Sequence, residues 1–366
     1  MGDPLNRAVN VGIVGAGNII VQYLATLPRL PGVRVSAVAD LESARAEAVA
    51  AEHEGVRALD PAELCRAEDV DLVLNLTVPA AHVDVSLAAI AGGKHVYTEK
   101  PLALTTADGR RVLDAAREAG VRVGCAPDTV LGTGTQTARR CVDEGSIGTP
   151  VAATAFMTSP GPERWHPSPS FFYRTGGGPL MDMGPYYLTA LVSMLGPVRR
   201  VSGMTATPRA TRTVGSGPAQ GSEVPVEVAT HVTGLLEHAD GALSTLVMSF
   251  DVWAAHLPRI EVYGTEGSVS VPDPNGFGGE VRLFHRDSPE WTPVPESGGH
   301  RGGGRGIGVG DLAEALAAGT PHRASGELGY HVLDVMESLL RTAGSGRAEE
   351  IASSCPRPEA VPLREA

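Results

Sequence analysis

The stretch "AVNVGIVGAG", residues 8–17, decides the fold of this chain. It begins as a run of small and β-branched apolar residues, which predicts a buried strand, and it ends on Gly15 and Gly17. The run "NIIVQYLATLPRL" follows at once and has the pattern of a helix. A strand that passes into a helix through a G-x-G turn is typical of a dinucleotide-binding unit.

The same alternation of strand and helix continues outward from this stretch. Strands are expected at 33–40, 71–79, 94–100 and 121–127, with helical patterns between them. The run "DLVLNLTVP" is apolar almost throughout, as in a parallel strand that is covered on both faces. The sequence therefore predicts an α/β fold that begins with an NAD-binding Rossmann domain, a doubly wound parallel sheet, at 1–127.

The pattern changes after about residue 150. Strand-like runs such as "VAATAFMTS" and "ALSTLVMSFDV" are separated by turn residues, with one helix expected at 185–196 and two near the end of the chain. This predicts an α+β domain at 128–366 with an open, mainly antiparallel sheet, used for substrate binding and oligomerisation. The glycine-rich stretch 297–310 is either a flexible loop or a loop that orders over a bound substrate.

Composition excludes several classes of partner. The 366 residues carry a formal charge of -12, which argues against nucleic acid and anionic membrane surfaces. No apolar stretch is long enough for a leader or a membrane span, so a cytoplasmic location is expected. The four cysteines form no C-x-x-C pair, and no His/Asp/Glu group has metal-ligand spacing, so no metal is expected.

The glycine turn and Asp40 together indicate the cofactor. Gly15 permits the tight turn, and Gly17 allows the backbone to approach a pyrophosphate; Ile20, at the third small position, departs from the fingerprint. Asp40 ends the second strand, where a carboxylate accepts hydrogen bonds from the adenosine ribose and repels a 2′-phosphate. This favours NAD over NADP. The alternative is that Asp40 only caps the helix that starts near Ser43.

Five segments, in order, carry a family resemblance. They are "GIVGAGNI", "NLTVPAAH", "YTEKPLAL", "DEGSIGTPV" and "GGGPLMDMGPYYLTAL". The chain resembles the glucose-fructose oxidoreductase, inositol dehydrogenase and MocA (Gfo/Idh/MocA) family from about residue 8 to residue 355. The most specific pair of motifs is the E-K-P tripeptide at 99–101 and the D-x-G element at 182–184.

The resemblance implies roles around the E-K-P tripeptide. Lys100 is expected beside the nicotinamide, reaching the substrate hydroxyl, and its bond to Pro101 is often cis in such proteins. Glu99 would bond the cofactor or neighbouring groups; the alternative is a surface ion pair with Lys100. Cofactor contacts are implied for Gly15, Gly17, Asn18, Ile19, Asp40, Thr77, Pro79, His82, Glu99 and Lys100.

Two of the matching positions are open to other readings. His82 could instead cap its helix. Asp128 stands where relatives often carry an Asn and an Arg, which puts its cofactor contact in doubt.

The second half of the resemblance implies a substrate site. Asp182 matches the substrate-binding aspartate of the family, and Tyr186 stands where a histidine is common. Positions i and i+4 share a helical face, so both side chains could reach one substrate, although Tyr186 could also be plain packing. Aromatic and polar residues upstream are expected to stack on or hydrogen-bond to a carbohydrate: Trp165, His166, Tyr173 and Arg174.

The function expected from this resemblance is NAD-dependent oxidation and reduction. A hydride would pass between nicotinamide and a secondary alcohol or ketone of a sugar, cyclitol or sugar-like substrate, including amino sugars. Either Lys100 is the base with Tyr186 orienting, or Tyr186 is the base with Lys100 lowering its pKa. The rivals are a redox-neutral lyase or glycosidase that oxidises transiently, and a non-catalytic NAD-sensing regulator. A homodimer or homotetramer is expected, through the open face of the second sheet.

Overall fold

The computed structural model describes residues 8–366, which fold into two compact units. The first unit comprises the chain up to Gly132, His300–Leu333 and Arg364–Ala366, and the second comprises Thr133–Gly299 and Asp334–Leu363. Residues 1–7, part of the N-terminal segment in which the sequence predicts no leader, lie outside the described residues. The boundaries of functional domains at 1–127 and 128–366 stay a prediction.

The first unit is built on a parallel sheet of six strands in the order β3-β2-β1-β4-β5-β6. The central strand β1 holds Val11–Val14 against Leu72–Asn75 of β4 on one side and pairs with β2 on the other. This confirms the doubly wound sheet. The strands are β1 (Val9–Val14), β2 (Val33–Ala39), β3 (Arg57–Leu59), β4 (Leu72–Asn75), β5 (His95–Thr98) and β6 (Val123–Cys125).

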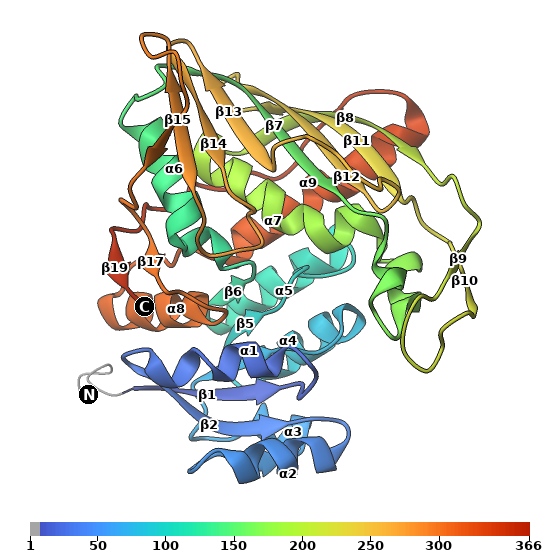
Figure 1. The fold of residues 1–366 in the computed structure, drawn as a ribbon. Coiled ribbons are helices and arrows are strands. Elements are labelled where there is room, and N and C mark those ends of the chain that lie inside the picture. The colour runs from blue at the N-terminus through green and yellow to red at the C-terminus, as the bar shows by residue number, and fades with distance from the viewer. Residues whose placement is uncertain (1–7) are drawn as a thin grey trace. The chain divides into compact units, whose positions relative to one another are not determined.

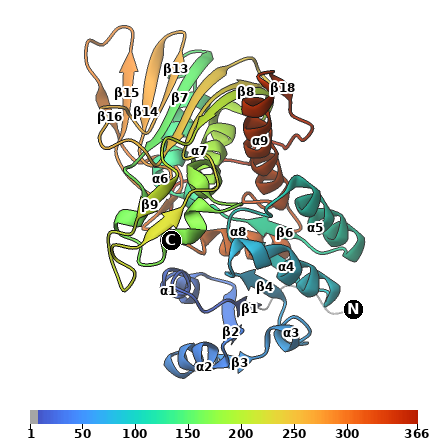
Figure 2. The same cartoon turned by 90° about the vertical axis from the view of Figure 1, so that its right-hand side faces the viewer.

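Helices cover both faces of this sheet (Figure 2). On one face Leu64, Ile90 and Leu113 pack into a single core cluster with the strands. On the other face α1 and the turn η1 are joined by α8, where a Cβ at Gly310 would lie 3.1 Å from Leu30. The helices are α1 (Ile20–Leu24), η1 (Leu27–Arg29), α2 (Ser43–Glu52), α3 (Pro61–Leu64), α4 (His82–Ala91), α5 (Thr106–Ala119) and α8 (Ile307–Ala318).

The second unit is built on a sheet of nine strands in the order β16-β15-β14-β13-β7-β12-β11-β8-β18. Every neighbouring pair is antiparallel except β12 and β7, which confirms the mainly antiparallel sheet. The strands are β7 (Pro150–Thr158), β8 (Val198–Ala206), β11 (His231–His238), β12 (Leu243–Ser249), β13 (Ile260–Gly264), β14 (Gly267–Val271), β15 (Val281–His285), β16 (Thr292–Val294) and β18 (Glu349–Glu350).

Helices of the second unit lie on one face of its sheet (Figure 1). They are α6 (Thr133–Asp143), α7 (Gly178–Leu195) and the part of α9 (Gly326–Ser345) that starts at Asp334. Small residues in the strands admit α9 closely, because a Cβ at Gly234 would lie 2.8 Å from Leu339 Cδ2. The expected start of the α7 helix at Pro185 was wrong: the helix begins at Gly178, with Pro185 inside it.

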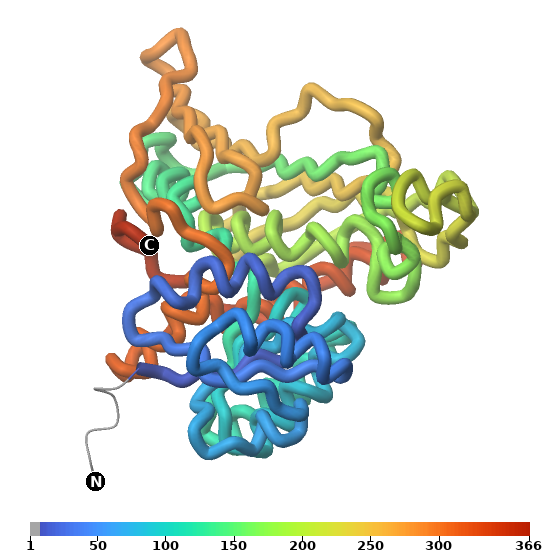
Figure 3. Tube along the Cα trace, turned by 60° about the horizontal axis from the view of Figure 1, so that its bottom comes forward, coloured from blue at the N-terminus to red at the C-terminus, as the bar shows by residue number. Residues whose placement is uncertain are grey.

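A short hairpin borders this sheet. Its strands β9 (Thr211–Thr213) and β10 (Glu223–Pro225) contact the turns η4 (Pro162–Arg164) and η5 (Pro169–Tyr173). In Figure 3 the hairpin is the yellow loop beside the green segment.

The glycine-rich stretch belongs to the first unit from His300 onward. Its strand β17 (His300–Arg301) pairs with β19 (Arg364–Glu365), and the stretch leads into α8 through Gly306, the N-cap of that helix.

Candidate active site

The glycine turn after β1 shows two different uses of glycine. Gly15 has a φ of 105°, and a Cβ there would lie 2.7 Å from the carbonyl carbon of Leu76. Only glycine therefore fits at this position. A Cβ at Gly17 would meet no described atom within 4 Å, so packing within the chain does not require glycine there. The open space beside its backbone is what the close approach of a pyrophosphate needs.

Asp40 is held beside this turn. Its Oδ2 accepts a hydrogen bond from the backbone N–H of Ala16 at 2.8 Å, and its Oδ1 accepts one from Glu42 N–H at 2.9 Å. The carboxylate thus bonds the N-cap residue of α2, Glu42, without being the helix cap itself, and also faces the glycine turn. Each oxygen has a further lone pair, so the residue fits a ribose diol without changing its position.

His82 joins the loop after β4 to the turn after β5. The ring is fully buried, with Nδ1 2.7 Å from the carbonyl oxygen of Pro101 and Nε2 3.0 Å from that of Thr77. Burial lowers the pKa of the ring, while the two carbonyls act in the opposite direction. Asn75 completes the link, because its Nδ2 donates to the His82 carbonyl at 2.9 Å and its Oδ1 accepts from the Thr77 hydroxyl at 2.7 Å.

The position of His82 bears on both of its expected roles. The ring bonds carbonyls outside the first turn of α4, so its contacts differ from those of a helix cap. A direct contact with cofactor stays a prediction; what the geometry provides is a fixed backbone at Thr77 and Pro101.

Glu99 and Lys100 lie where β5 ends. Glu99 is 8% exposed, and its Oε1 accepts a hydrogen bond from the Tyr23 hydroxyl at 2.8 Å. Its Oε2 accepts from the backbone N–H of Lys100 at 3.0 Å. The Lys100–Pro101 bond is cis, and Lys100 is half-buried. Glu99 is therefore a buried group that anchors this corner to α1, in contrast to a surface ion pair.

The sequence carries a signal for this corner that pattern reading missed. Of its 30 basic residues only two are lysines, Lys94 and Lys100, one at each end of β5. Arginine remains protonated in proteins, whereas lysine loses its proton readily when it is buried. Lysine at position 100 therefore provides, in a chain that uses arginine almost everywhere else, a basic group that is able to lose its proton.

Asp128 anchors the start of α8. It is fully buried, and its Oδ2 accepts hydrogen bonds from the backbone N–H groups of Gly306 at 2.8 Å and Gly308 at 3.0 Å. Burial raises the pKa of the carboxyl to about 6. A Cβ at Gly308 would overlap the Tyr97 hydroxyl, so position 308 of the glycine-rich stretch has no room for a side chain. The stretch connects directly to α8, which packs on the parallel sheet.

The residues expected to bind substrate lie in the second unit. Asp182 and Tyr186 are in α7, four positions apart, with Asp182 half-buried and Tyr186 buried. Lys100 belongs to the first unit, so the joint action of these three side chains stays a prediction.

The segment before α7 separates its residues by exposure. Trp165 and Arg174 are exposed, and His166 is half-buried with its Nδ1 accepting from Ser168 N–H at 3.1 Å. Tyr173 is fully buried and donates its hydroxyl proton to Glu163. The expected substrate contacts of all four stay predictions, and that of Tyr173 would need its bond to Glu163 to open.

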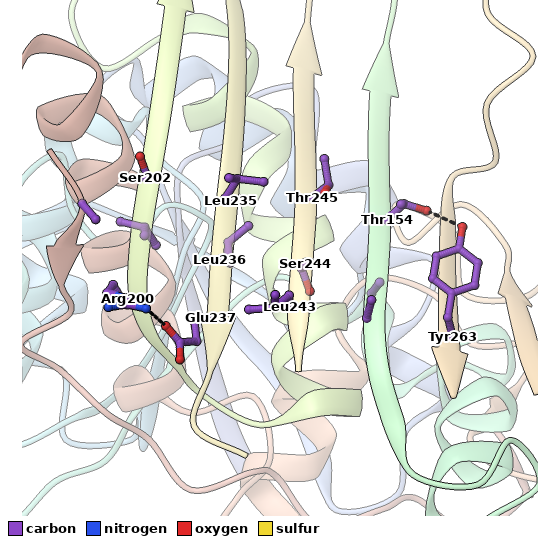
Figure 4. A pocket seen from close by; sticks show the side chains of 14 residues that line it. Thr154, Arg200, Ser202, Leu235, Leu236, Glu237, Leu243, Ser244, Thr245 and Tyr263 are labelled. Atoms are coloured by element: carbon purple, nitrogen blue, oxygen red, sulfur yellow. Dashed lines mark hydrogen bonds and ion pairs between the residues drawn. The ribbon is translucent and has the colours of Figure 1, made fainter. Parts of the chain in front are cut away.

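A hollow lies on the sheet of the same unit. It has a volume of about 590 Å³ and is lined by side chains from β7, β8, β11, β12 and β13 (Figure 4). Leu235 and Leu243 present apolar surface there, while Arg200 pairs with Glu237 at 2.6 Å and Thr154 bonds Tyr263 at 3.0 Å. No helix of residues 8–366 is both long and apolar enough to cross a membrane.

The parallel sheet and the glycine turn are those of a dinucleotide-binding Rossmann fold, and comparison with known proteins identifies the class as an NAD-binding oxidoreductase. Residues 9–126 match the model for the oxidoreductase family with an NAD-binding Rossmann fold, and residues 135–270 match the GFO/IDH/MocA C-terminal domain. The chain belongs to the Gfo/Idh/MocA family, and its cofactor is NAD.

Individual relatives are similar over most of the chain. The 1,5-anhydro-D-fructose reductase of Ensifer adhaerens is 27% identical over 93% of this chain and 98% of its own. The dTDP-3,4-didehydro-2,6-dideoxy-alpha-D-glucose 3-reductase of Streptomyces violaceoruber is 31% identical over 72% of this chain and 79% of its own. A crystal structure of an NAD binding oxidoreductase from Klebsiella pneumoniae superposes with a TM-score of 0.81 at 25% identity, covering 95% of this chain and 100% of that chain.

Proposed function

We propose that this protein moves a hydride between NAD and a secondary alcohol or ketone of a sugar, cyclitol or sugar-like compound, amino sugars included. The observation that carries the proposal is the corner at the end of β5. There the buried Glu99 accepts hydrogen bonds from Tyr23 and from the backbone of Lys100, one of only two lysines in the chain.

In this proposal Lys100 carries the proton. NAD, when bound, supplies the hydride acceptor at its nicotinamide ring. Lys100 takes the proton of the substrate hydroxyl in oxidation and returns it in reduction. The reference pKa of lysine is about 10.4, and partial burial favours the neutral amine that a base requires. Asp182 and Tyr186 are proposed to bind and orient the same hydroxyl.

The cofactor end of the site fits these roles. Asp40 receives the ribose, Gly15 and Gly17 receive the pyrophosphate with Asn18 and Ile19, and Thr77, Pro79 and His82 border the loop after β4. Asp40 supports this assignment because its orientation is fixed by Ala16 and Glu42.

The proposed substrate class draws on the relatives. Two of them are named for the reduction of sugar-derived ketones, an anhydrofructose and a dideoxy sugar nucleotide. Together with Asp182 in the D-x-G element, these names favour a carbohydrate-like compound, without favouring one direction of the reaction.

The experiment is a screen for NADH formation. Purified protein is incubated with NAD and a panel of sugars, cyclitols and aminoglycosides while absorbance at 340 nm and product are followed. The proposal expects NADH in step with a ketone product for at least one compound. Product without net NADH would identify a redox-neutral lyase or glycosidase instead. Tight NADH binding with no product from any compound would favour an NAD-sensing regulator.

We also propose that a second copy of the chain covers the open face of the nine-stranded sheet. Leu235 and Leu243 are more than half exposed there, around a hollow of about 590 Å³. The rim carries both signs of charge, Arg199 and Arg200 with Glu237 between them. A surface with an apolar centre and mixed charges at its edge is self-complementary under a two-fold axis.

The proposed location is the cytoplasm. The four cysteines are buried and form no disulfide bond, which fits a reducing compartment.

A further inference from the structure

Two of the three tryptophans of this chain are largely exposed on one unit. Trp165 is 67% exposed and Trp253 is 63% exposed, both in the second unit. Phe171 is also more than half exposed. Large aromatic rings left in water usually mark a surface that binds something.

These rings belong to two neighbouring loops. His166 packs edge-on against Trp165 with ring centroids 5.5 Å apart and against Phe171 at 5.3 Å. The guanidinium of Arg164 lies 4.5 Å from the centre of the Trp253 ring. Residues 162–173 and 251–257 thus present one surface, which we call the aromatic platform: Trp165, Phe171 and Trp253, with Arg164 and His166 between them.

A buried arginine ties the two loops together from beneath. Arg212, on the β9–β10 hairpin, is 2% exposed. Its Nη1 donates to Glu163 Oε1 at 3.3 Å and to the Phe250 carbonyl at 3.2 Å, and its Nη2 donates to Asp251. Glu163 directly precedes Arg164 and Trp165, and Asp251 stands two residues before Trp253.

Further bonds complete the network below the platform. The Tyr173 hydroxyl donates to Glu163, and the Thr230 hydroxyl donates to Asp251 at 2.6 Å. Buried ion pairs add little net stability compared with apolar packing, because the desolvation of the charges offsets their attraction. What this network provides is position: it holds the loop of Trp165 and the loop of Trp253 in one geometry.

The platform leads directly into the helix of the proposed substrate site. A Cβ at Gly177 would lie 2.5 Å from the Phe171 carbonyl oxygen, so the chain folds back tightly from the platform into α7. Asp182 lies in the second turn of that helix. Within this unit the aromatic rings and the proposed substrate aspartate are therefore parts of one continuous segment.

We propose that the aromatic platform binds a second ring of the substrate, so that the ligand is a glycoside or oligosaccharide and not a free monosaccharide. The indole and phenyl faces would stack on the C–H face of a pyranose, and Arg164 and His166 would hydrogen-bond its hydroxyls. Three rings with a guanidinium and an imidazole beside them suit a ring-sized polar ligand better than a protein, whose interface needs about 800 Å² per partner. The link to Asp182 rests on the function proposed above.

Intrinsic fluorescence tests the platform without turnover. The wild-type protein is titrated with maltose, cellobiose, trehalose and the two-ring aminoglycoside neamine, with glucose as the one-ring comparison. At least one two-ring compound is expected to change tryptophan emission and to bind more tightly than glucose. Trp165→Ala and Trp253→Ala should each weaken that binding about 3- to 10-fold, the scale of one stacked ring.

Trp291→Ala is the matched control. Trp291 is 38% exposed in the same unit but packs on Phe284, away from both loops, so its loss should leave affinity unchanged. The proposal is overturned if none of the four two-ring compounds binds, or if both platform variants bind them as tightly as the wild type does. It is also overturned if light scattering gives either variant a smaller assembly mass than the wild type, because the platform would then be a contact between copies of the chain. Two-ring binding without NADH formation would refute the proposed function while leaving the platform intact; NADH formation from glucose-sized compounds alone would do the reverse.

Discussion

Asp40 illustrates how one carboxylate serves both the fold and cofactor choice. Because backbone N–H groups of Ala16 and Glu42 hold both oxygens, the charge stays beside the glycine turn. Exposed Leu41 follows it, where an arginine would be needed to hold a 2′-phosphate. We predict tighter binding of NADH than of NADPH. Asp40→Ala should weaken NADH binding about 10- to 100-fold, the scale of hydrogen bonds to a charged group. The difference in affinity between NADH and NADPH should become smaller in this variant.

Fluorescence titration of both cofactors measures this. Asp60→Ala is the control, because Asp60 is also an aspartate that accepts backbone N–H bonds at the start of a helix in the same unit, here α3. Equal affinity of the wild type for the two cofactors, or an equal effect of both variants, would contradict the role of Asp40.

At the scale of residues, the sequence predicts where the site residues stand along the chain better than it predicts which groups they hydrogen-bond. Gly15, Gly17 and Asp40 are adjacent to strand ends, so local pattern alone locates them. The hydroxyl that holds Glu99 comes from Tyr23, and the backbone that Asp128 holds comes from Gly306. Such pairs are far apart in sequence, and no local periodicity reports them.

The bond between Tyr23 and Glu99 links helix α1 to the end of strand β5. Tyr23→Phe removes the only donor that Oε1 of this buried carboxylate has among the hydrogen bonds described here. We expect the free energy of unfolding to fall by about 1 to 3 kcal/mol, the cost of leaving a buried charged acceptor unsatisfied.

Tyr97→Phe is the matched control for this prediction. Tyr97 is as deeply buried in the same unit, but its hydroxyl has no hydrogen-bond partner among the described residues. Its loss should change stability by less than 1 kcal/mol, since no bond is broken. Urea denaturation of both variants decides: equal losses would show that the Tyr23 hydroxyl contributes nothing specific.

The anchor of α8 should depend on pH. Asp128 has a folded pKa raised to about 6, so between that value and the ordinary value near 3.9 the folded protein binds more protons than the unfolded chain. Stability from this group therefore rises as pH falls. We predict that the wild type gains about 1.4 kcal/mol relative to Asp128→Asn between pH 7.5 and pH 5.

Calorimetry of the two proteins at both pH values measures this difference, and it removes the contribution of other titrating groups. A gap that stayed constant, or that moved in the opposite direction, would show that Asp128 does not titrate in this range.

At the scale of elements, the strands and the long amphipathic helices can be predicted from the sequence. Proline and glycine, which usually mark the ends of helices, mislead here. The sequence predicts a helix at 185–196, yet α7 begins seven residues earlier, at Gly178, and accommodates Pro185 in its interior. Helix α6 was not predicted: its "TGTQTARRCVD" opens with three threonines and one glycine in the first five positions, where stronger helix formers are expected. Its burial against the sheet overrides that weak propensity.

Association is the prediction for the whole molecule. If a second copy covers the open sheet face, light scattering at micromolar concentration should return a dimer or tetramer mass. Leu235→Glu should shift the mass toward the monomer, because a charge would be buried in an apolar contact. Leu257→Glu, at a leucine that is 51% exposed but off the sheet, should not. A monomer mass for the wild type would refute the proposal.

The composition of the two units shows the limit of sequence reading at this scale. Helix α8 lies in residues 300–333, which return to the parallel sheet after the whole second sheet has formed. Nothing in the pattern of 307–318 distinguishes a helix that packs on one sheet from one that packs on the other. The family was predictable because several motifs occur in order along the chain. Both types of sheet were predictable because the pattern of strand-like runs and intervening helices or turns extends over many residues.

The central claim is that Lys100 carries the proton of the reaction, and two lysine variants test it most directly. With the panel compound that yields NADH, Lys100→Arg and Lys100→Ala should lose turnover by about 10²–10⁴-fold, since arginine cannot give up its proton, while NADH still binds. Lys94→Arg should remain near wild type, because Lys94 only donates to the Ala67 carbonyl. Tyr186→Phe should weaken substrate binding and leave the pH–rate profile in place. Full turnover in Lys100→Arg, or loss of the pH dependence in Tyr186→Phe alone, would contradict the account.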